Sequence, residues 1–299
     1  MNGILIIDKP AGLTSHDVVN RVRRILQTKS VGHLGTLDPL ATGVLPLVVG
    51  NLTRLAQFYT SSEKTYEGVI RFGFATDTYD AEGTPTSPPS KVKVSLEEVR
   101  ALAARFRGVI EQVPPPFSAK KIEGMPAYKL ARRHKEFILK PVRVEVKEFE
   151  ITSAENDRAS FRARVASGTY MRSVAHDLGQ QMGCGAHLES LRRTSVAEFE
   201  LADVHTLEEL DAATRNGSGE EMFVHPRKVL PQLPCVTANE EMAARVRTGR
   251  SVNLPEFSRA KQVKVFQGQR ELIAIATRVA GTLFHPKIVL AADQQLTAN

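Results

Sequence analysis

The segment from Gly32 to Gly50, GHLGTLDPLATGVLPLVVG, constrains the fold more than any other part of the chain. It contains four glycines and two prolines. Gly permits positive φ and close backbone approach, whereas Pro fixes φ at about −65°, so we predict a shaped loop and not a helix. The apolar run Val44–Val49 at its end predicts a buried strand. A polar loop anchored by an apolar strand often carries a functional site.

Two side chains of this segment could take part in chemistry. Asp38 stands immediately before Pro39, where the backbone is pushed out of the α region, and His33 lies five residues earlier. An Asp-Pro pair is also a common turn, and a lone His more often satisfies local hydrogen bonds. The segment by itself therefore leaves both the structural and the chemical interpretation open.

The charge distribution favours a polyanionic partner. The chain of 299 residues has a formal net charge of +7. Residues 117–147 hold 9 Lys and Arg against 3 Asp and Glu, and residues 225–299 hold 11 against 5. Either block alone is typical of solvated surface. Two blocks on an otherwise mildly acidic chain favour contact with nucleic acid.

Other classes of protein are disfavoured by composition. With 42% hydrophobic and 24% charged residues, the chain can bury a core. No apolar run approaches the roughly 18 residues of a membrane span, and the start MNGILIIDKP lacks the basic region of a signal peptide. We therefore expect a cytoplasmic protein without membrane contact. Cys184 and Cys235 are expected to be free thiols, and eight scattered histidines give no metal-site spacing.

Local patterns predict an α+β fold whose central mixed or antiparallel sheet is flanked by helices, because strands and helices mix without βαβ alternation. Thr14 with Asp17 and Ser95 with Glu98 predict capping boxes at two helix starts. Residues 77–90, polar and rich in Pro and Gly, predict an exposed loop. We expect strands at 3–7, 44–49, 65–74, 142–151 and 160–167 and within 188–199, and further helices at 170–182 and 206–213.

The pattern of apolar and polar residues changes near residue 229. A helix at 240–247 and strand-like runs at 262–266, 271–277 and 282–290 predict a small β-rich domain over 229–299, after a main domain over 1–228. The run Val113–Phe117, VPPPF, cannot form regular structure. It opens a basic excursion that we place at about 113–141.

Segments along the chain resemble one family. In order they are KPAGLTSHDVV (9–19), GHLGTLDPLATGVLPL (32–47), KTYEGVIRFGFATDTYDAEG (64–83), and SGTYMRSVAHDLG (167–179) with LRRTSVAEF (191–199). Together they look like the bacterial TruB pseudouridine synthases, over roughly residues 1–200. PPPFSAKKIEGMPAYKLAR (114–132) resembles that family's RNA-gripping insertion, and the part beyond about 230 resembles, more loosely, its PUA-like RNA-binding module.

The resemblance implies a function. The family converts the T-loop uridine of tRNA, position 55 in tRNA numbering, to pseudouridine. The bond from uracil N1 to ribose C1′ breaks, the base turns, and it rejoins through C5. Because atoms are only rearranged, neither a cofactor nor a metal is implied. The implied partner is tRNA, and we expect a monomer without an obligate protein partner.

The resemblance also assigns catalytic roles. Asp38 matches the family's nucleophile, and a carboxylate can attack covalently. Attack at C1′, attack at uracil C6 and a route through proton loss from C2′ all remain open. Arg172 matches a residue that would face Asp38 and favour its charged form. Tyr66 matches the active-site tyrosine, which packs on the target base and is a candidate for taking the proton from C5. Packing alone is its alternative role.

Other matching residues would bind the RNA. Tyr170 and Leu191 match contacts to the flipped base, and His33 matches the residue that fills the gap left by base flipping. Leu34 departs from the family, since many relatives have a small polar residue there. Lys9 and Pro10 are expected to support the sheet beneath the site. The basic excursion supplies a predicted RNA-binding patch of Lys120, Lys121, Arg132 and Arg133.

Two alternative functions are also compatible with the sequence. One is an RNA chaperone or binding protein built on the same fold, which the basic blocks fit equally well. The other is an enzyme of the same family that acts on another RNA. A chemical test for pseudouridine after incubation with RNA distinguishes the binding protein from the enzyme. A comparison of turnover on tRNA and rRNA hairpins distinguishes the two enzymes.

Overall fold

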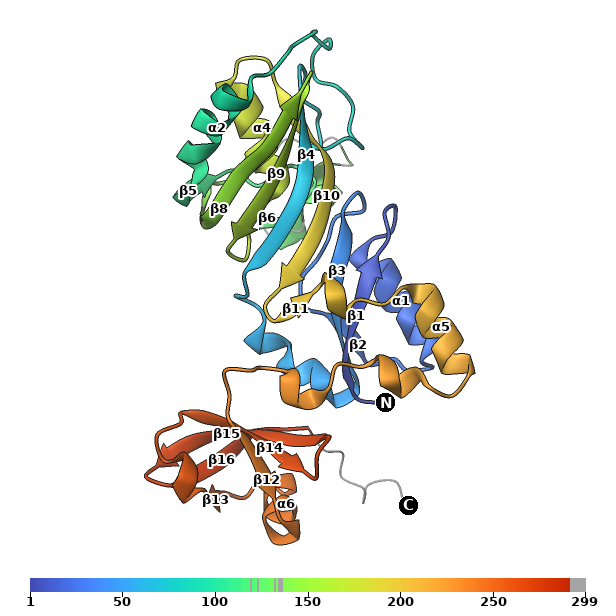
Figure 1. Ribbon diagram of the computed structural model, residues 1–299, viewed down its shortest axis with the longest axis vertical. Coiled ribbons are helices and arrows are strands. Elements are labelled where there is room, and N and C mark those ends of the chain that lie inside the picture. Colours follow the sequence, from blue (N-terminus) through green and yellow to red (C-terminus); the bar gives the residue numbers. More distant parts are fainter. Residues whose placement is uncertain (119, 123, 132, 134–136, 291–299) are drawn as a thin grey trace.

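The computed structural model describes residues 1–118, 120–122, 124–131, 133 and 137–290, except for the side chains of Lys121 and Pro126 (Figure 1). The described chain forms one long mixed sheet with helices against it, and then a smaller sheet that Figure 1 shows at the opposite end of the molecule's longest axis. The predicted α+β class is confirmed.

The large sheet has nine strands in the order β1-β3-β10-β4-β9-β8-β5, with β2 on β3 and β11 on β10. Neighbouring strands are antiparallel except β3 and β10, which are parallel. The strands are β1 (Gly3–Lys9), β2 (Val31–His33), β3 (Thr42–Val49), β4 (Lys64–Phe72), β5 (Gly108–Gln112), β8 (Val142–Glu155), β9 (Arg158–Val165), β10 (Ala186–Val196) and β11 (Phe199–Glu200).

The parallel join between β3 and β10 depends on a glycine. Gly43 lies opposite Arg193 with φ of +100°, and a Cβ built there would lie 2.2 Å from the Arg193 carbonyl oxygen. No side chain fits, so glycine is required for the two backbones to approach. This join brings the chain that follows Asp38 against β10.

Two predicted helix starts have different outcomes. At the start of α1, Thr14 Oγ1 accepts from the Asp17 N–H (3.0 Å) and the Asp17 carboxylate accepts from the Thr14 N–H (2.9 Å), so the capping box is confirmed. Ser95 precedes α2 but makes no side-chain capping bond, so that capping box is wrong. The helices are α1 (Ser15–Ile25), α2 (Leu96–Ala103), α3 (Ala127–Ala131), α4 (Met171–Gln181), α5 (Leu207–Arg215) and α6 (Glu240–Arg247).

Short elements connect the helices and strands of both domains. The hairpin of β6 (Lys121–Ile122) and β7 (Met125–Pro126) leads into α3 within the basic excursion. The 3₁₀ turns are η1 (Gly50–Phe58), η2 (Ala104–Phe106), η3 (Leu201–Asp203), η4 (Gly219–Met222), η5 (Pro226–Lys228) and η6 (Pro255–Phe257).

The apolar strand β1 is buried on both faces. Leu5 and Ile7 join a first core cluster with residues of β3, β4, β9, α1, α2 and α4. Ile4 and Ile6 join a second cluster on the other face of the sheet. Because side chains alternate along a strand, an unbroken apolar run fits this position. Strand β1, which pairs with the strand β3 that follows the Asp38 loop, is thus fixed from both sides.

The C-terminal domain is β-rich. Its five strands lie in the order β12-β14-β15-β16-β13. They are β12 (Cys235–Ala238), β13 (Val252–Asn253), β14 (Gln262–Gln267), β15 (Glu271–Ala280) and β16 (Leu283–Val289). The domain does not stand free, because Leu230, Phe266 and Ile275 belong to the same cluster as Ile4. A boundary at residue 228 and the PUA-like identity stay predictions. In the described part of the chain, no helix has the length and apolar character that crossing a membrane requires.

Candidate active site

The loop between β2 and β3 presents Asp38 at a tight turn. The Ala41 N–H donates to the Asp38 carbonyl at 3.1 Å, so the backbone of Asp38-Pro39 does form a turn. Its carboxylate does not cap this turn but points toward α4, with 35% of the side chain exposed. The structural and the chemical interpretations of Asp38 are therefore compatible.

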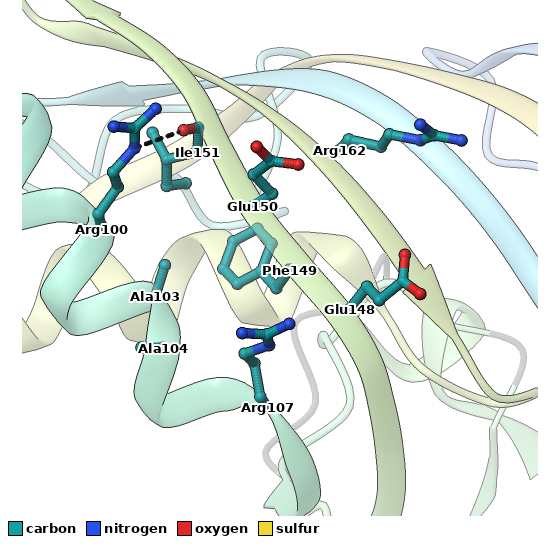
Figure 2. A pocket seen from close by; sticks show the side chains of 9 residues that line it. All are labelled: Arg100, Ala103, Ala104, Arg107, Glu148, Phe149, Glu150, Ile151 and Arg162. Carbon is teal, nitrogen blue, oxygen red and sulfur yellow. Dashed lines mark hydrogen bonds between the residues drawn. The ribbon is translucent and has the colours of Figure 1, made fainter.

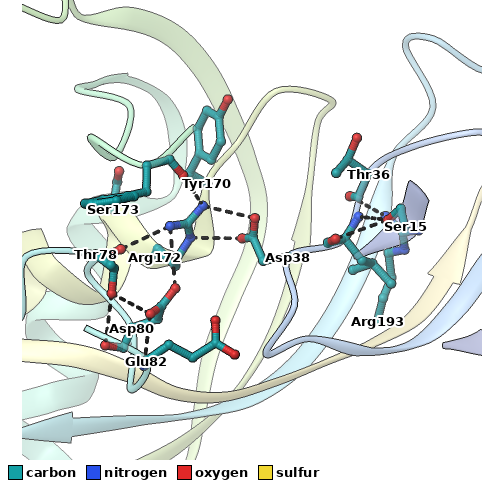
Figure 3. Close-up of polar contacts among 12 residues, drawn as sticks. Ser15, Thr36, Asp38, Thr78, Asp80, Glu82, Tyr170, Arg172, Ser173 and Arg193 are labelled. Atoms are coloured by element: carbon teal, nitrogen blue, oxygen red, sulfur yellow. Dashed lines mark hydrogen bonds and ion pairs between the residues drawn. The ribbon is translucent and has the colours of Figure 1, made fainter. Parts of the chain in front are cut away.

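Arg172, in the first turn of α4, meets the carboxylate at two points (Figure 3). Its Nη2 donates to Asp38 Oδ1 at 3.0 Å, and its Nε lies 2.9 Å from Oδ2. The Nε contact is close enough for an ion pair, but its N–H is not directed at an acceptor among the described residues. Since the Arg172 side chain is only 5% exposed, its charge is screened little by water.

The far side of the Arg172 guanidinium is also held. Nη1 donates to the Thr78 carbonyl at 3.1 Å and lies 3.5 Å from Asp80 Oδ2, and Nη2 donates to the Phe117 carbonyl at 3.0 Å. Asp80 is 4% exposed, so the prediction of an exposed loop over 77–90 is wrong at this residue. The reason is that an ion pair with a buried arginine outweighs the local loop signal.

The remaining predicted residues surround this pair in different ways. Tyr170 stands at the N-cap position of α4 without a side-chain capping bond and is half-buried, and burial raises the pKa of its hydroxyl. Gln112 fixes its backbone through two hydrogen bonds, of 2.8 and 3.1 Å. Tyr66 and Leu191 are buried on β4 and β10, in the same core cluster as Leu37 of the loop.

His33 ends β2 on the other side of the loop. Its Nδ1 accepts from the Gly35 N–H at 3.3 Å. Burial, with Arg193 nearby, lowers the pKa of His33, so the ring is neutral at neutral pH. In the basic patch, Lys120 and Arg133 are exposed, whereas the Lys121 side chain and Arg132 lie outside the described residues.

The sequence did not reveal that Arg193 of β10 holds the loop. This fully buried side chain donates from Nε to the Val44 carbonyl (2.8 Å), from Nη1 to the Thr36 carbonyl (3.2 Å) and from Nη2 to the Gly35 carbonyl (3.0 Å). Burial lowers the pKa of Arg193, and its interaction with Tyr66 opposes that shift. Two adjacent arginines in an otherwise alternating strand are the signal that could have indicated it.

Lys9 and Ser15 hold the other end of the loop. The Lys9 ammonium donates to the carbonyls of Pro10 (2.8 Å), Pro39 (3.2 Å) and Ala41 (2.7 Å). Ser15 Oγ accepts from the Leu37 N–H at 2.8 Å and lies 3.1 Å from the Leu37 carbonyl. Lys9 was expected to support the sheet; what it secures is the loop itself, because the carbonyls that need a donor are there.

One pocket lies elsewhere, between α2 and β8 (Figure 2). It has a volume of about 410 Å³, and its lining includes Arg100, Arg107, Arg162 and Glu148. It contains none of the predicted site residues. In the described residues, His, Cys, Asp and Glu side chains form no group of three or more that could hold a metal ion.

Comparisons with known proteins agree with this geometry. Residues 23–171 match the model of the TruB family pseudouridylate synthase N-terminal domain, and residues 172–231 match the tRNA pseudouridylate synthase B C-terminal domain. The tRNA pseudouridine synthase B of Solibacter usitatus is 48% identical over 97% of this chain and 100% of its own length. That of Aquifex aeolicus is 37% identical over the same shares.

Solved structures show the same fold at lower identity. A Cbf5-Nop10-Gar1 complex contains a chain that matches 97% of this one and 85% of its own length, with a TM-score of 0.70 and 24% identity. An H/ACA RNP bound to a substrate RNA gives a TM-score of 0.71 at 23% identity, with the same coverage. The site and the relatives together define a pseudouridine-forming isomerase. This chain belongs to the TruB family of pseudouridylate synthases.

Arg193 should be essential for stability. Arg193→Met would remove a buried donor from three carbonyls, of which that of Val44 is buried and those of Thr36 and Gly35 are partly buried. We expect the free energy of unfolding to fall by about 3 kcal/mol. The neighbouring Arg192 is the matched control, because its side chain is 41% exposed and pairs with Asp8. Arg192→Met should cost about 1 kcal/mol or less. Equal losses in urea titrations of the two variants would contradict the assignment.

Lys9 should give the protein a pH-dependent stability. Burial lowers the pKa of Lys9 from 10.5 to about 8, whereas the unfolded chain keeps the ordinary value. Between these values the unfolded state binds more protons, so this contribution to the free energy of unfolding increases as pH rises. We expect the difference in unfolding free energy between wild type and Lys9→Met to increase from pH 8 to 10. A constant difference would contradict the assignment. The control is Lys64→Met, which removes another lysine with a pKa of about 8 but keeps Lys9. Its free energy of unfolding should still increase over this pH range.

Proposed function

We propose that the protein isomerises the T-loop uridine of tRNA, position 55 in tRNA numbering, to pseudouridine, with Asp38 as the nucleophile. The observation that carries this proposal is the Asp38–Arg172 pair. The arginine is buried at 5% exposure while the carboxylate keeps 35% of its surface open to a substrate. A structural ion pair has no need of this asymmetry. Membership of the TruB family and the names of the relatives support the choice of tRNA.

The residues around Asp38 suggest a division of work. The uridine leaves its stack, and Asp38 attacks it covalently while Arg172 favours the charged form of the carboxylate. The N1–C1′ bond breaks, the base turns, C5 bonds to C1′, and the bond to Asp38 breaks to release the carboxylate. The proton lost from C5 is balanced by one gained at N1. Tyr66, buried beneath the loop and beside Arg193, is the proposed acceptor of the proton that leaves C5. The proposal requires no cofactor or metal.

Binding of the rest of the RNA is assigned to other residues. Tyr170 and Leu191 are proposed to contact the flipped base, with His33 in the gap that the base leaves. A neutral, flat His33 ring suits stacking between bases. The basic excursion and the C-terminal domain, proposed to be PUA-like, would contact the phosphates. We propose a cytoplasmic monomer that needs no protein partner.

The nucleophile can be tested with isosteric substitutions. Asp38→Asn keeps the shape and removes the negative charge, so we expect pseudouridine formation on an unmodified T-arm hairpin to fall by at least about 1,000-fold. Asp77→Asn is the matched control, because Asp77 is an exposed carboxylate whose bond is to the Thr84 N–H. It should retain wild-type activity. Turnover by Asp38→Asn at the wild-type rate would show that another residue is the nucleophile.

The basic patch can be tested through salt. Changing Lys120, Lys121, Arg132 and Arg133 to Ala should weaken RNA binding, and each lost phosphate contact should flatten the plot of log affinity against log salt by roughly 0.7. Lys91→Ala with Lys93→Ala removes two exposed charges before α2 and should leave the slope unchanged. If the variant with all four substitutions kept the wild-type slope, the patch would be ordinary solvated surface.

A further inference from the structure

A stacked pair of rings lies beside the Asp38–Arg172 pair. The rings of Tyr79 and His176 have centroids 3.8 Å apart and planes 11° from parallel. Tyr79 belongs to the chain that follows β4, and His176 lies in α4 four residues after Arg172. Residues four apart share one face of a helix. The stack therefore connects the turn around Tyr79 to the face of α4 that carries Arg172.

Tyr79 has a backbone conformation that residues other than glycine rarely adopt. Its φ is +65°, in the left-handed region. Its N–H donates to the Thr76 carbonyl at 3.2 Å, and its carbonyl accepts from the Leu188 N–H at 3.0 Å. The ring contact with His176 adds a side-chain anchor to these backbone bonds. Such a conformation persists when the surrounding structure holds it in place, and it is common next to functional residues.

The neighbours of Tyr79 are the groups that hold Arg172. The Thr78 carbonyl accepts from Nη1 at 3.1 Å, and Asp80 Oδ2 lies 3.5 Å from the same nitrogen. Tyr79 is the single residue that connects them, so its φ and ψ set their relative positions. A rotation at Tyr79 would displace one acceptor relative to the other.

His176 contributes a flat ring and not a charge. Burial lowers the pKa of His176, and its Nδ1 is buried with no hydrogen-bond partner among the described residues. An unpaired buried nitrogen is unfavourable. A neutral ring whose buried Nδ1 has no partner among the described residues therefore serves here through its face, which stacks on Tyr79.

We propose that the Tyr79–His176 stack positions Arg172 for the reaction. It fixes the turn of residues 78–80 against α4, so that Thr78 and Asp80 hold Nη1 while Nε and Nη2 face Asp38. This inference rests on the proposed function, because its kinetic effect is measured through the reaction of Asp38. Tyr79 and His176 are positioning residues, since they act through Arg172.

The test is a double-mutant cycle. Tyr79→Gly removes one ring while glycine accepts the positive φ, so backbone strain is not introduced. His176→Leu fills much of the volume without a flat ring. We expect each variant to lower kcat by about 10-fold through misplacement of Arg172, with KM within about twofold of wild type. Because both changes break one contact, the double variant should be no slower than the slower single variant. His176→Phe, which keeps a flat ring, should recover at least about half of the wild-type kcat.

A control and a second measurement complete the design. Phe199→Leu removes a different aromatic contact, with Tyr59 at 5.6 Å, and should lower stability without changing kcat. The NMR signal of the Arg172 Nε–H group should shift in Tyr79→Gly and His176→Leu but not in Phe199→Leu. An unshifted signal, or kinetic losses that multiply in the double variant, would overturn the proposal. If wild-type protein formed no pseudouridine, the proposed function would fail, while the NMR comparison would still decide the role of the stack.

Discussion

The contact between Asp38 and Arg172 persists in a partly buried site because both terminal nitrogens of the guanidinium have further acceptors. For a buried arginine with a single partner, the free-energy cost of desolvation usually exceeds the gain from one ion pair. Here the carbonyls of Thr78 and Phe117 and the carboxylate of Asp80 share the charge. These groups come from segments far apart in the sequence. The position of Asp38's partner therefore depends on the whole main domain being folded.

The loop that carries Asp38 is held by cationic side chains that donate hydrogen bonds to its backbone. Its backbone carbonyls point inward, where they would be unsatisfied, and the buried cations Arg193 and Lys9 donate to them. Because these donors come from β10 and β1, the loop is fixed to two strands of the large sheet. Burial lowers the pKa of both cations, so the protein accepts an electrostatic cost to obtain a rigid loop. A rigid loop means that Asp38, the proposed nucleophile, would lose little entropy when it reaches the reactive geometry.

The sequence predicted what local patterns can encode. The loop that carries Asp38, the strand predicted over 44–49 and the capping box at Thr14 follow from residue spacing, and the TruB resemblance indicated Arg172 as the partner of Asp38. The sequence did not predict contacts between residues that lie far apart in the chain. Arg193 lies 149 residues from Val44, and Asp80 was assigned to an exposed loop although Arg172 draws it inside. Local propensity contains no information about such distant partners. This explains why the contacts of Arg193 with the loop were missed and why the prediction at Asp80 was wrong.

The proposed reaction is that of Asp38 with a uridine in a tRNA T-loop. The most direct measurement is to incubate the wild-type protein, without added metal or cofactor, with an unmodified T-arm hairpin and to map pseudouridine chemically along it. We expect conversion at the T-loop position and at no other uridine. An RNA that binds with high affinity but contains no pseudouridine after prolonged incubation would contradict it and would favour an RNA-binding role.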